Sequence, residues 1–151
     1  MKKIVKLFAG AAVLGVLAAL SGCGLLGGDK TDVFSLKVGD CGDVASFGGS
    51  SVSEVKLVAC TEPHNGEVIY LFDMPDGAFD EDAIWDAVKD QCIKAMDSYV
   101  GPNWDEVGLE PGGLFPSEGS WNNMHDREIV CYAQTQSGQN ELTDTVKGLG
   151  R

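Results

Sequence analysis

Basic residues are scarce in this sequence. The chain holds 11 lysines and arginines against 23 aspartates and glutamates, a formal net charge of −12. Lys2, Lys3 and Lys6 all lie in residues 1–22, which contain no carboxylate, so without that segment the net charge becomes −15 (−12 − 3). Because binding to phosphate requires a cationic surface, we expect no nucleic-acid partner. The same charge disfavours an electrostatic attachment to anionic lipid.

Long apolar runs and catalytic signatures are also scarce. The uncharged apolar stretch Leu7–Leu20 has about 14 residues, short of the ~20 that a membrane-spanning helix needs. The sequence has only 2 histidines and contains no Cys-x-x-Cys or His-x-x-x-His spacing, so a redox-active cysteine pair or a zinc ribbon has little support. A length of 151 residues leaves room for one modest domain.

The N-terminal segment has the layout of an export signal. A lysine-rich start, the apolar stretch and the small residues Ser21 and Gly22 are typical of a signal peptide over residues 1–22. The run LSGC, ending at Cys23, matches the bacterial lipobox, in which the cysteine carries a diacylglyceryl group. We therefore expect Cys23 to be lipidated, residues 23–32 to form the anchor and a Gly-rich tether, and the protein to lie on the extracytoplasmic face of the cell membrane.

Four cysteines follow the lipidation candidate, and an even number in an exported domain predicts two disulfides. Cys41, Cys60, Cys92 and Cys131 allow three pairings. We favour Cys41 with Cys60 and Cys92 with Cys131. The second bond would join the apolar stripe of the expected helix to an apolar strand.

The hydrophobic pattern predicts an α+β fold: a small antiparallel or mixed sheet of about four strands packed against one main helix. Residues 33–136 form the expected domain and residues 137–151 a polar C-terminal tail of uncertain order. Helical spacing over residues 80–100 places Trp85 in an apolar stripe with other core residues. The expected strands are 33–38, 53–60, 67–72 and 127–136, with a flexible loop at 47–51 and a long ordered loop at 103–126.

One local pattern resembles a known family. The pieces are Gly-Asp-Cys at residues 39–41, Cys-x-x-Pro-His-x-x-Glu-Val at residues 60–68, Cys92 in the helix, and Trp121 followed by Asp126-Arg127 and the last cysteine. Together, over residues 36–133, they resemble the septum-formation domain of actinobacterial envelope proteins. His125 stands where that pattern leads us to expect glycine. The resemblance implies a role around cell division and carries no catalytic mechanism.

His64 and Glu67 are the candidates for acid–base chemistry. A spacing of three puts them on opposite faces of a strand, unless a turn at residues 65–66 brings them together. We favour a structural role, in which His64 hydrogen-bonds the turn that precedes it and Glu67 accepts from neighbouring backbone. A metal site that joins His64 to His125 and Asp126 is the weaker alternative, and we expect no metal and no cofactor.

The remaining motif residues also have structural interpretations. Asp126 and Arg127 are expected to close a turn, with Arg127 pairing with a buried or interfacial carboxylate. Trp121, in the predicted loop, is expected to pack into the fold rather than anchor an interface.

We therefore predict a non-catalytic, lipid-anchored envelope module linked to septum formation, which interacts with envelope or division proteins. The alternative is a small envelope hydrolase or ligand-binding protein that uses His64 and Glu67.

Overall fold

The computed structural model describes residues 30–44, 52–139 and 141–151. The predicted signal peptide, Cys23, the loop at residues 47–51 and the tether up to residue 29 lie outside the described residues.

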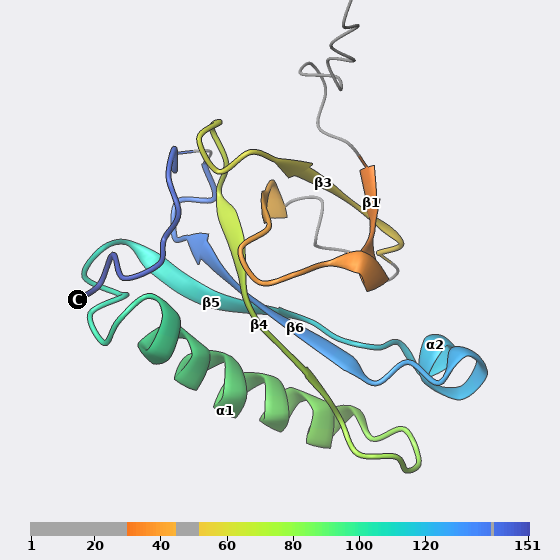
Figure 1. The fold of residues 1–151 in the computed structure, drawn as a ribbon. Helices are drawn as coiled ribbons and strands as arrows, with labels where there is room; N and C mark the ends of the chain where they lie inside the picture. The colour runs from red at the N-terminus through yellow and green to blue at the C-terminus, as the bar shows by residue number, and fades with distance from the viewer. Residues whose placement is uncertain (1–29, 45–51, 140) are drawn as a thin grey trace, which may run out of the picture.

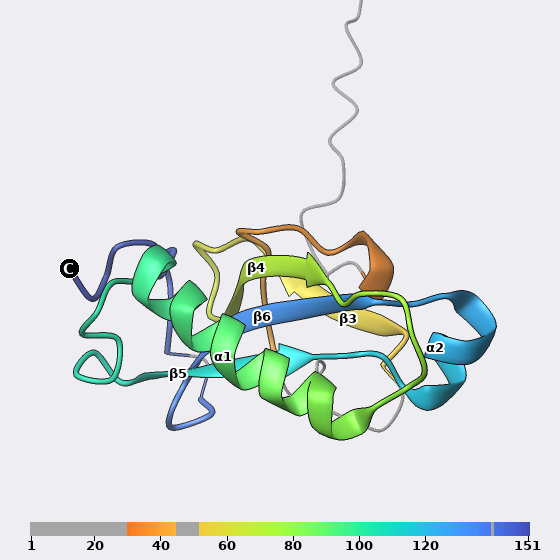
Figure 2. The ribbon, with the colours of Figure 1, turned by 90° about the horizontal axis from the view of Figure 1, so that it is seen from below.

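An antiparallel sheet organises the fold. Within the described residues it has six strands in the order β1-β3-β2-β4-β6-β5, rather than the roughly four that the sequence pattern predicts. Figures 1 and 2 show α1 along one face of the β4–β6–β5 part, with the β1–β3 segment near the opposite face. The strands are β1 (Lys30–Asp32), β2 (Cys41–Gly42), β3 (Glu54–Val58), β4 (Gly66–Asp73), β5 (Leu109–Leu114) and β6 (Glu128–Thr135).

The long pair β4–β6 is the centre of the sheet and is covered on both faces. On β6, Ile129, Cys131 and Ala133 face α1 and are 0% exposed, as the alternation in the sequence predicts. A bulge in β4 between Val68 and Tyr70 interrupts the register with β6. The extra residue explains why the apolar run of β4 shows no simple alternation.

Helix α1 spans Glu81–Tyr99 and confirms the helix predicted from spacing. Asp80 is its N-cap, and its side chain accepts a hydrogen bond from the Ala83 backbone at 3.0 Å. Trp85 is not a core residue, which corrects the prediction. Its side chain is 41% exposed and packs edge-on against Phe115, because Ile84, at 1% exposure, takes the inward position one residue earlier.

Strand β5 lies where the sequence predicted an irregular loop. Its sequence, LEPGGL, contains the residues that usually interrupt a strand, and Pro111 is tolerated because β5 lies at the edge of the sheet. Gly112 is required by close contact: a Cβ there would lie 2.2 Å from the ring of Tyr132. The aromatic ring therefore fills the space that a side chain would take.

A second helix also lies in the segment that was predicted to be a loop. Helix α2 spans Glu118–Met124, with Ser117 as N-cap. The prediction of one main helix is therefore incomplete. Gly and Ser are poor helix formers, and the cap and the burial of Trp121 support this short helix instead.

The start of the domain also differs from the prediction. Residues Val33–Ser35 form a 3₁₀ helix (η1), not a strand, because the Asp32 side chain accepts from the Phe34 backbone at 3.0 Å and caps the turn. Lys30–Asp32, expected in the tether, pairs with β3 as strand β1. The folded part therefore begins closer to Cys23 than the sequence suggested.

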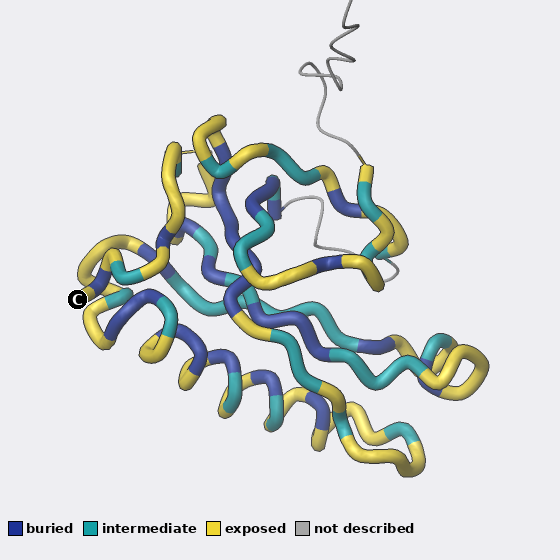
Figure 3. The backbone as a smooth tube through the Cα atoms, in the orientation of Figure 1, coloured by how far each residue is buried: buried dark blue, intermediate teal, exposed yellow. Residues whose placement is uncertain are grey.

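The C-terminal segment packs against the domain. Val146 is 0% exposed and Gly150 is buried, although residues 137–151 read as a polar tail. Gly101 has a φ of +123°, and a Cβ on it would lie 2.6 Å from the Gly150 backbone. The folded unit thus extends past the predicted boundary at residue 136, and the burial pattern in Figure 3 includes this segment.

Both favoured disulfides are confirmed among the described residues. Cys41–Cys60 joins β2 to the turn after β3, and Cys92–Cys131 joins α1 to β6. Cys92 and Cys131 are 1% and 0% exposed, so this bond lies inside the core between helix and sheet.

Candidate functional site

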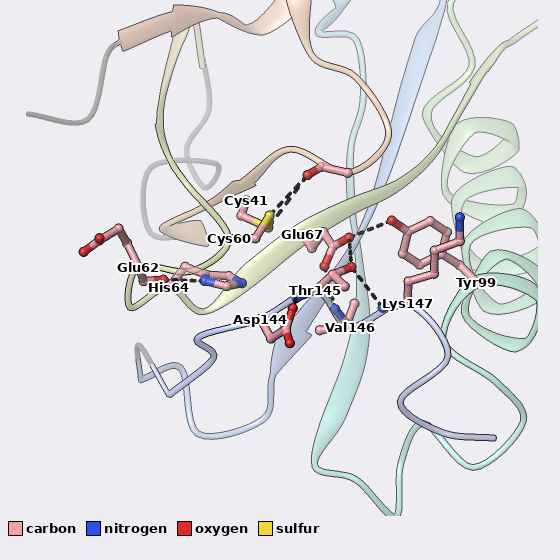
Figure 4. The surroundings of a disulfide bond; sticks show 11 residues. Cys41, Cys60, Glu62, His64, Glu67, Tyr99, Asp144, Thr145, Val146 and Lys147 are labelled. Atoms are coloured by element: carbon pink, nitrogen blue, oxygen red, sulfur yellow. Dashed lines mark hydrogen bonds between the residues drawn. A yellow bond between two sulfur atoms is a disulfide. The ribbon is translucent and has the colours of Figure 1, made fainter. Parts of the chain in front are cut away.

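Glu67 is a buried acceptor of three hydrogen bonds. It lies on β4 with 0% exposure and points toward α1 and the C-terminal segment (Figure 4). Three groups donate to its carboxylate. Tyr99 Oη and Thr145 Oγ1 donate to Oε1 at 2.6 and 2.8 Å, and the Val146 backbone N–H donates to Oε2 at 2.7 Å.

These donors come from separate parts of the chain. Tyr99 ends α1, while Thr145 and Val146 belong to the C-terminal segment. Glu67 therefore ties helix and C-terminal segment to the central strand. The predicted structural role had Glu67 accept from neighbouring backbone; the backbone donor instead lies 79 residues away along the sequence.

The pKa of Tyr99 is raised in this environment. Burial, the hydrogen bond to Glu67 and the charge of that carboxylate together raise the pKa of Tyr99 to about 12, and burial is the largest cause. The phenol stays protonated and remains a donor through the neutral range.

His64 has a different environment. Its backbone exchanges two hydrogen bonds of 3.0 Å with Leu142, which form an isolated bridge. The ring is 0% exposed, and Nδ1 lies 2.8 Å from the Glu62 carbonyl oxygen. Since a carbonyl oxygen only accepts, Nδ1 is the donor, and the ring bonds to the preceding turn as expected. Nε2 is buried and makes no hydrogen bond within the described residues.

His64 and Glu67 do not form a hydrogen-bonded pair among the described residues. Glu67 is occupied by its three donors, and the His64 ring turns to the Glu62 carbonyl (Figure 4). The arrangement holds chain segments together and presents neither side chain to solvent.

Asn65 is a structural residue that sequence reasoning missed. Its side chain accepts from the Val44 backbone at 2.7 Å and donates to Asp43 and to the Gly138 carbonyl at 3.2 and 3.1 Å. It is 3% exposed. The adjacent Gly66 made Asn65 look like an ordinary turn residue, so the sequence offered no signal for its burial.

Trp121, Asp126 and Arg127 meet at the other end of the β4–β6 pair. Trp121 is 3% exposed and donates from Nε1 to the Gly77 carbonyl at 2.9 Å, so it packs into the fold. The Arg127 guanidinium lies 3.9 Å from the centre of its ring. The Asp126 side chain accepts from the Glu128 backbone at 3.3 Å and closes the turn before β6.

The predicted ion pair of Arg127 is with an exposed carboxylate. Arg127 Nε donates to Asp76 at 3.2 Å, and the Asp76 side chain is 92% exposed, so the buried alternative of the prediction is wrong. Arg127 Nη1 also donates to the carbonyls of Trp121 and Asp126 at 2.9 and 2.8 Å. The arginine therefore closes the α2–β6 connection mainly through carbonyls and ring stacking.

His125 caps α2 in the left-handed region, with φ 55° and ψ 30°. This backbone conformation explains why the family pattern leads to glycine at that position. His125 and His64 sit at opposite ends of the β4–β6 ladder, so they cannot share a ligand. No group of three metal-ligating side chains suited to an ion occurs in the described part of the chain.

Two of the hollows on the described surface have polar side chains in their linings. The larger, of about 560 Å³, lies at the α2–β6 connection and includes His125, Asp126 and Arg127 in its lining. The smaller, of about 350 Å³, lies between β4 and α1 and is lined in part by Tyr70, Lys94 and Tyr99. The predicted residues His64 and Glu67 line neither hollow.

The fold and the two disulfides together define a small α+β domain. Its polar motif residues, such as Glu67 and Arg127, make hydrogen bonds that hold its segments together. The family model described as "Septum formation" matches residues 38–150, which is most of the chain. The chain belongs to this septum formation family, and the match supports a role in the cell envelope related to division.

The match includes the C-terminal segment that docks on Glu67. Comparisons with curated proteins and with solved structures give no match. Neither helix in the described ranges combines the length and apolar character needed to cross a membrane.

Proposed function

We propose that this protein is a non-catalytic, lipid-anchored module of the cell envelope that contributes to septum formation by binding other proteins. Family membership over residues 38–150 supports the link to division. The observation that carries the non-catalytic part is the burial of both acid–base candidates. His64 and Glu67 are each 0% exposed, and Glu67 already accepts three hydrogen bonds.

The proposed anchor is the diacylglyceryl group on Cys23, and it would hold the domain at the extracytoplasmic face of the membrane. Residue 30 is the first residue of β1, seven positions after Cys23. A fully extended chain covers about 3.3 to 3.6 Å per residue, so the sheet would start within roughly 25 Å of the lipid. Binding partners would therefore be envelope or division proteins near the membrane.

The anchor and the septal role are tested with a fluorescent fusion of the full-length chain in dividing cells. We expect the wild-type fusion to be membrane-bound and enriched at the septum, and Cys23→Ala to leave the membrane. A Cys23→Ala protein that stays membrane-bound would contradict the anchor. A wild-type fusion spread evenly around the cell would contradict the septal role.

The non-catalytic proposal is tested by His64→Asn in the same cells. The Asn amide can still donate to the Glu62 carbonyl, whereas the imidazole needed for proton transfer is gone. We expect septal enrichment and cell division to match the wild type. Loss of division activity in a His64→Asn protein that unfolds like the wild type would favour a hydrolase.

A further inference from the structure

The larger hollow has the features of a docking groove for another protein. Two large apolar side chains at its rim are exposed to solvent, Phe34 by 49% and Met124 by 62%. The ends of β4 and β6 and the turns next to them also line this hollow. Those turns and strand ends contribute the carboxylates Asp73, Asp76, Asp126 and Glu128.

Two of these carboxylates are placed directly against each other. Asp73 and Glu128 are register partners at the ends of β4 and β6. Like charges directly opposite each other on paired strands destabilise a sheet. Burial raises the pKa of Glu128, and the nearby charges of Asp73 and Asp126 raise it further. The fold therefore places two like charges opposite each other, and no ion pair within the described residues includes either of them.

The guanidinium group in the lining is not paired with these two carboxylates. Arg127 bonds to Asp76 and to two carbonyl oxygens, and its guanidinium stacks on Trp121. Its ion pair is with Asp76, not with Asp73 or Glu128. A cation supplied from outside would relieve the repulsion between these two carboxylates.

We propose that this groove docks a basic segment of a partner protein that carries at least one large apolar side chain. The lysine or arginine groups of that segment lie against Asp73 and Glu128, and the apolar side chain packs between Phe34 and Met124. The exposed apolar side chains and the carboxylates Asp73 and Glu128 of the groove favour a basic protein segment with an apolar side chain. They disfavour an anionic lipid surface, because the carboxylates repel it.

Position along the chain also favours a partner near the membrane. Phe34 lies 11 residues after Cys23 in the sequence. At most about 3.6 Å per residue, this places the groove rim within roughly 40 Å of the proposed anchor. The inference rests on the proposed function, since it names the class of partner for an envelope module.

Binding is measured with the full-length protein in nanodiscs of zwitterionic lipid. The probe is a fluorescent peptide that contains four lysines and two leucines. A matched peptide with serine in place of leucine tests the apolar contact. The double variant Asp73→Asn/Glu128→Gln should weaken binding by about tenfold, because it removes two closely placed charges from the contact. The control Asp86→Asn/Glu106→Gln makes the same charge change at exposed positions outside the groove.

The apolar rim has its own pair of variants. Met124→Ser should weaken binding of the leucine peptide and leave that of the serine peptide unchanged. Ile93→Ser, at a residue 45% exposed on α1, should affect neither. Unfolding by denaturant serves as the fold control, and Asp73→Asn/Glu128→Gln should unfold at a higher denaturant concentration than the wild type because the repulsion is gone.

Several results would overturn the docking groove. Equal weakening by the two charge pairs would show non-specific attraction, and equal affinity for both peptides would remove the apolar contact. Displacement of the peptide by millimolar Ca²⁺ or Mg²⁺, dependent on Asp73 and Glu128, would make the groove a cation site instead.

A photo-crosslinking residue at position 124 tests the groove in cells, with position 93 as the matched exposed control. The expected product joins position 124 to a basic segment of another protein and disappears in Asp73→Asn/Glu128→Gln. A crosslink to an acidic or uncharged segment overturns the inference. If the wild type is not enriched at the septum but these patterns hold, the proposed septal function fails and the groove stands. If enrichment holds while the groove variants crosslink like the wild type, the groove fails and the function stands.

Discussion

Tyr99 Oη donates to Glu67 Oε1 at 2.6 Å and joins the last residue of α1 to the middle of the sheet. The same carboxylate receives the Thr145 hydroxyl and the Val146 backbone N–H. The Glu67 side chain therefore connects β4 to α1 and to the C-terminal segment. Its partners lie 32 residues away in α1 and 78 and 79 residues away in the C-terminal segment. The stability of the domain should depend strongly on this side chain.

Replacing Glu67 by alanine should lower the free energy of unfolding by about 3 kcal/mol, because the buried Val146 N–H and two hydroxyls lose their acceptor. Glu67→Gln should cost less, about 1 to 2 kcal/mol, since one amide oxygen still accepts. Denaturant unfolding of the full-length protein measures both. Glu54→Ala is the control, because Glu54 forms an exposed pair with Lys30. A Glu67→Ala protein as stable as this control would contradict the linking role.

Removal of the C-terminal segment should abolish cooperative unfolding. Deletion of residues 139–151 removes Val146, which is 0% exposed and whose backbone N–H donates to Glu67. Both Glu67 and the part of the core against which Val146 packs are then uncovered. Deletion of Arg151 alone is the matched control, since its side chain makes one exposed hydrogen bond of 3.3 Å to Ser98. If the long deletion unfolded with the same midpoint as the short one, the segment would be a dispensable tail after all.

The sequence predicted the regular central elements well. Apolar residues recur with the helical period in α1 and with the strand period in β6, because one face of each element packs on the core. The disulfide pairing followed from the placement of Cys92 and Cys131 on those faces. Local pattern and tertiary structure agree in these elements.

Elements that depend on distant contacts were missed. Strand β5 has a Pro-Gly-Gly sequence that predicts a loop, and only the Tyr132 ring over Gly112 and pairing with β6 make it a strand. The C-terminal segment is held against the domain because the Glu67 carboxylate accepts a hydrogen bond from the Val146 N–H. These two residues are 79 positions apart in the sequence. No local periodicity could signal such contacts.

The sequence pointed to residues of the candidate site but not to their partners. It singled out His64 and Glu67, but their spacing could not show that Tyr99 and Thr145 would occupy the carboxylate. Arg127 was expected to pair with a buried or interfacial carboxylate; it pairs with the exposed Asp76, and its other contacts are two carbonyls and the Trp121 ring. Pairings across the fold are not encoded by local composition.

The disulfides should differ in their resistance to reduction. Cys92–Cys131 is buried on both sides, whereas Cys60 is partly exposed. Mild reductant should therefore open Cys41–Cys60 first, as mass spectrometry after alkylation would show. Loops of 19 and 39 residues correspond to about 3 and 4 kcal/mol in the loop-entropy model. The Cys92→Ala/Cys131→Ala protein should accordingly be the less stable double variant, and the reverse order would contradict this view.

Glycine should be accepted at position 125. His125 has φ 55°, a conformation that costs an L-residue about 1 to 2 kcal/mol, while glycine loses about 0.5 to 1 kcal/mol through its greater unfolded-state entropy. His125→Gly should therefore raise the free energy of unfolding by up to about 1.5 kcal/mol. His125→Val, β-branched at the same backbone angles, should lower it. Denaturant midpoints of the two variants would contradict the cap geometry if their order were reversed.

Alkaline pH should weaken the domain through Tyr99. Its pKa is raised from 10.0 to about 12 in the folded protein, so the folded state keeps this proton after the unfolded state has released it. The associated stability is fully present below pH 10 and is lost as pH rises through about 12. Burial and the Glu110 charge also raise the pKa of Tyr132, so the wild type alone cannot assign the effect. Tyr99→Phe, which lacks the titrating hydroxyl, should show a shallower loss of stability over that range, measured as denaturant midpoint against pH. An unchanged slope in Tyr99→Phe would mean that the Tyr99–Glu67 contact does not control alkaline unfolding.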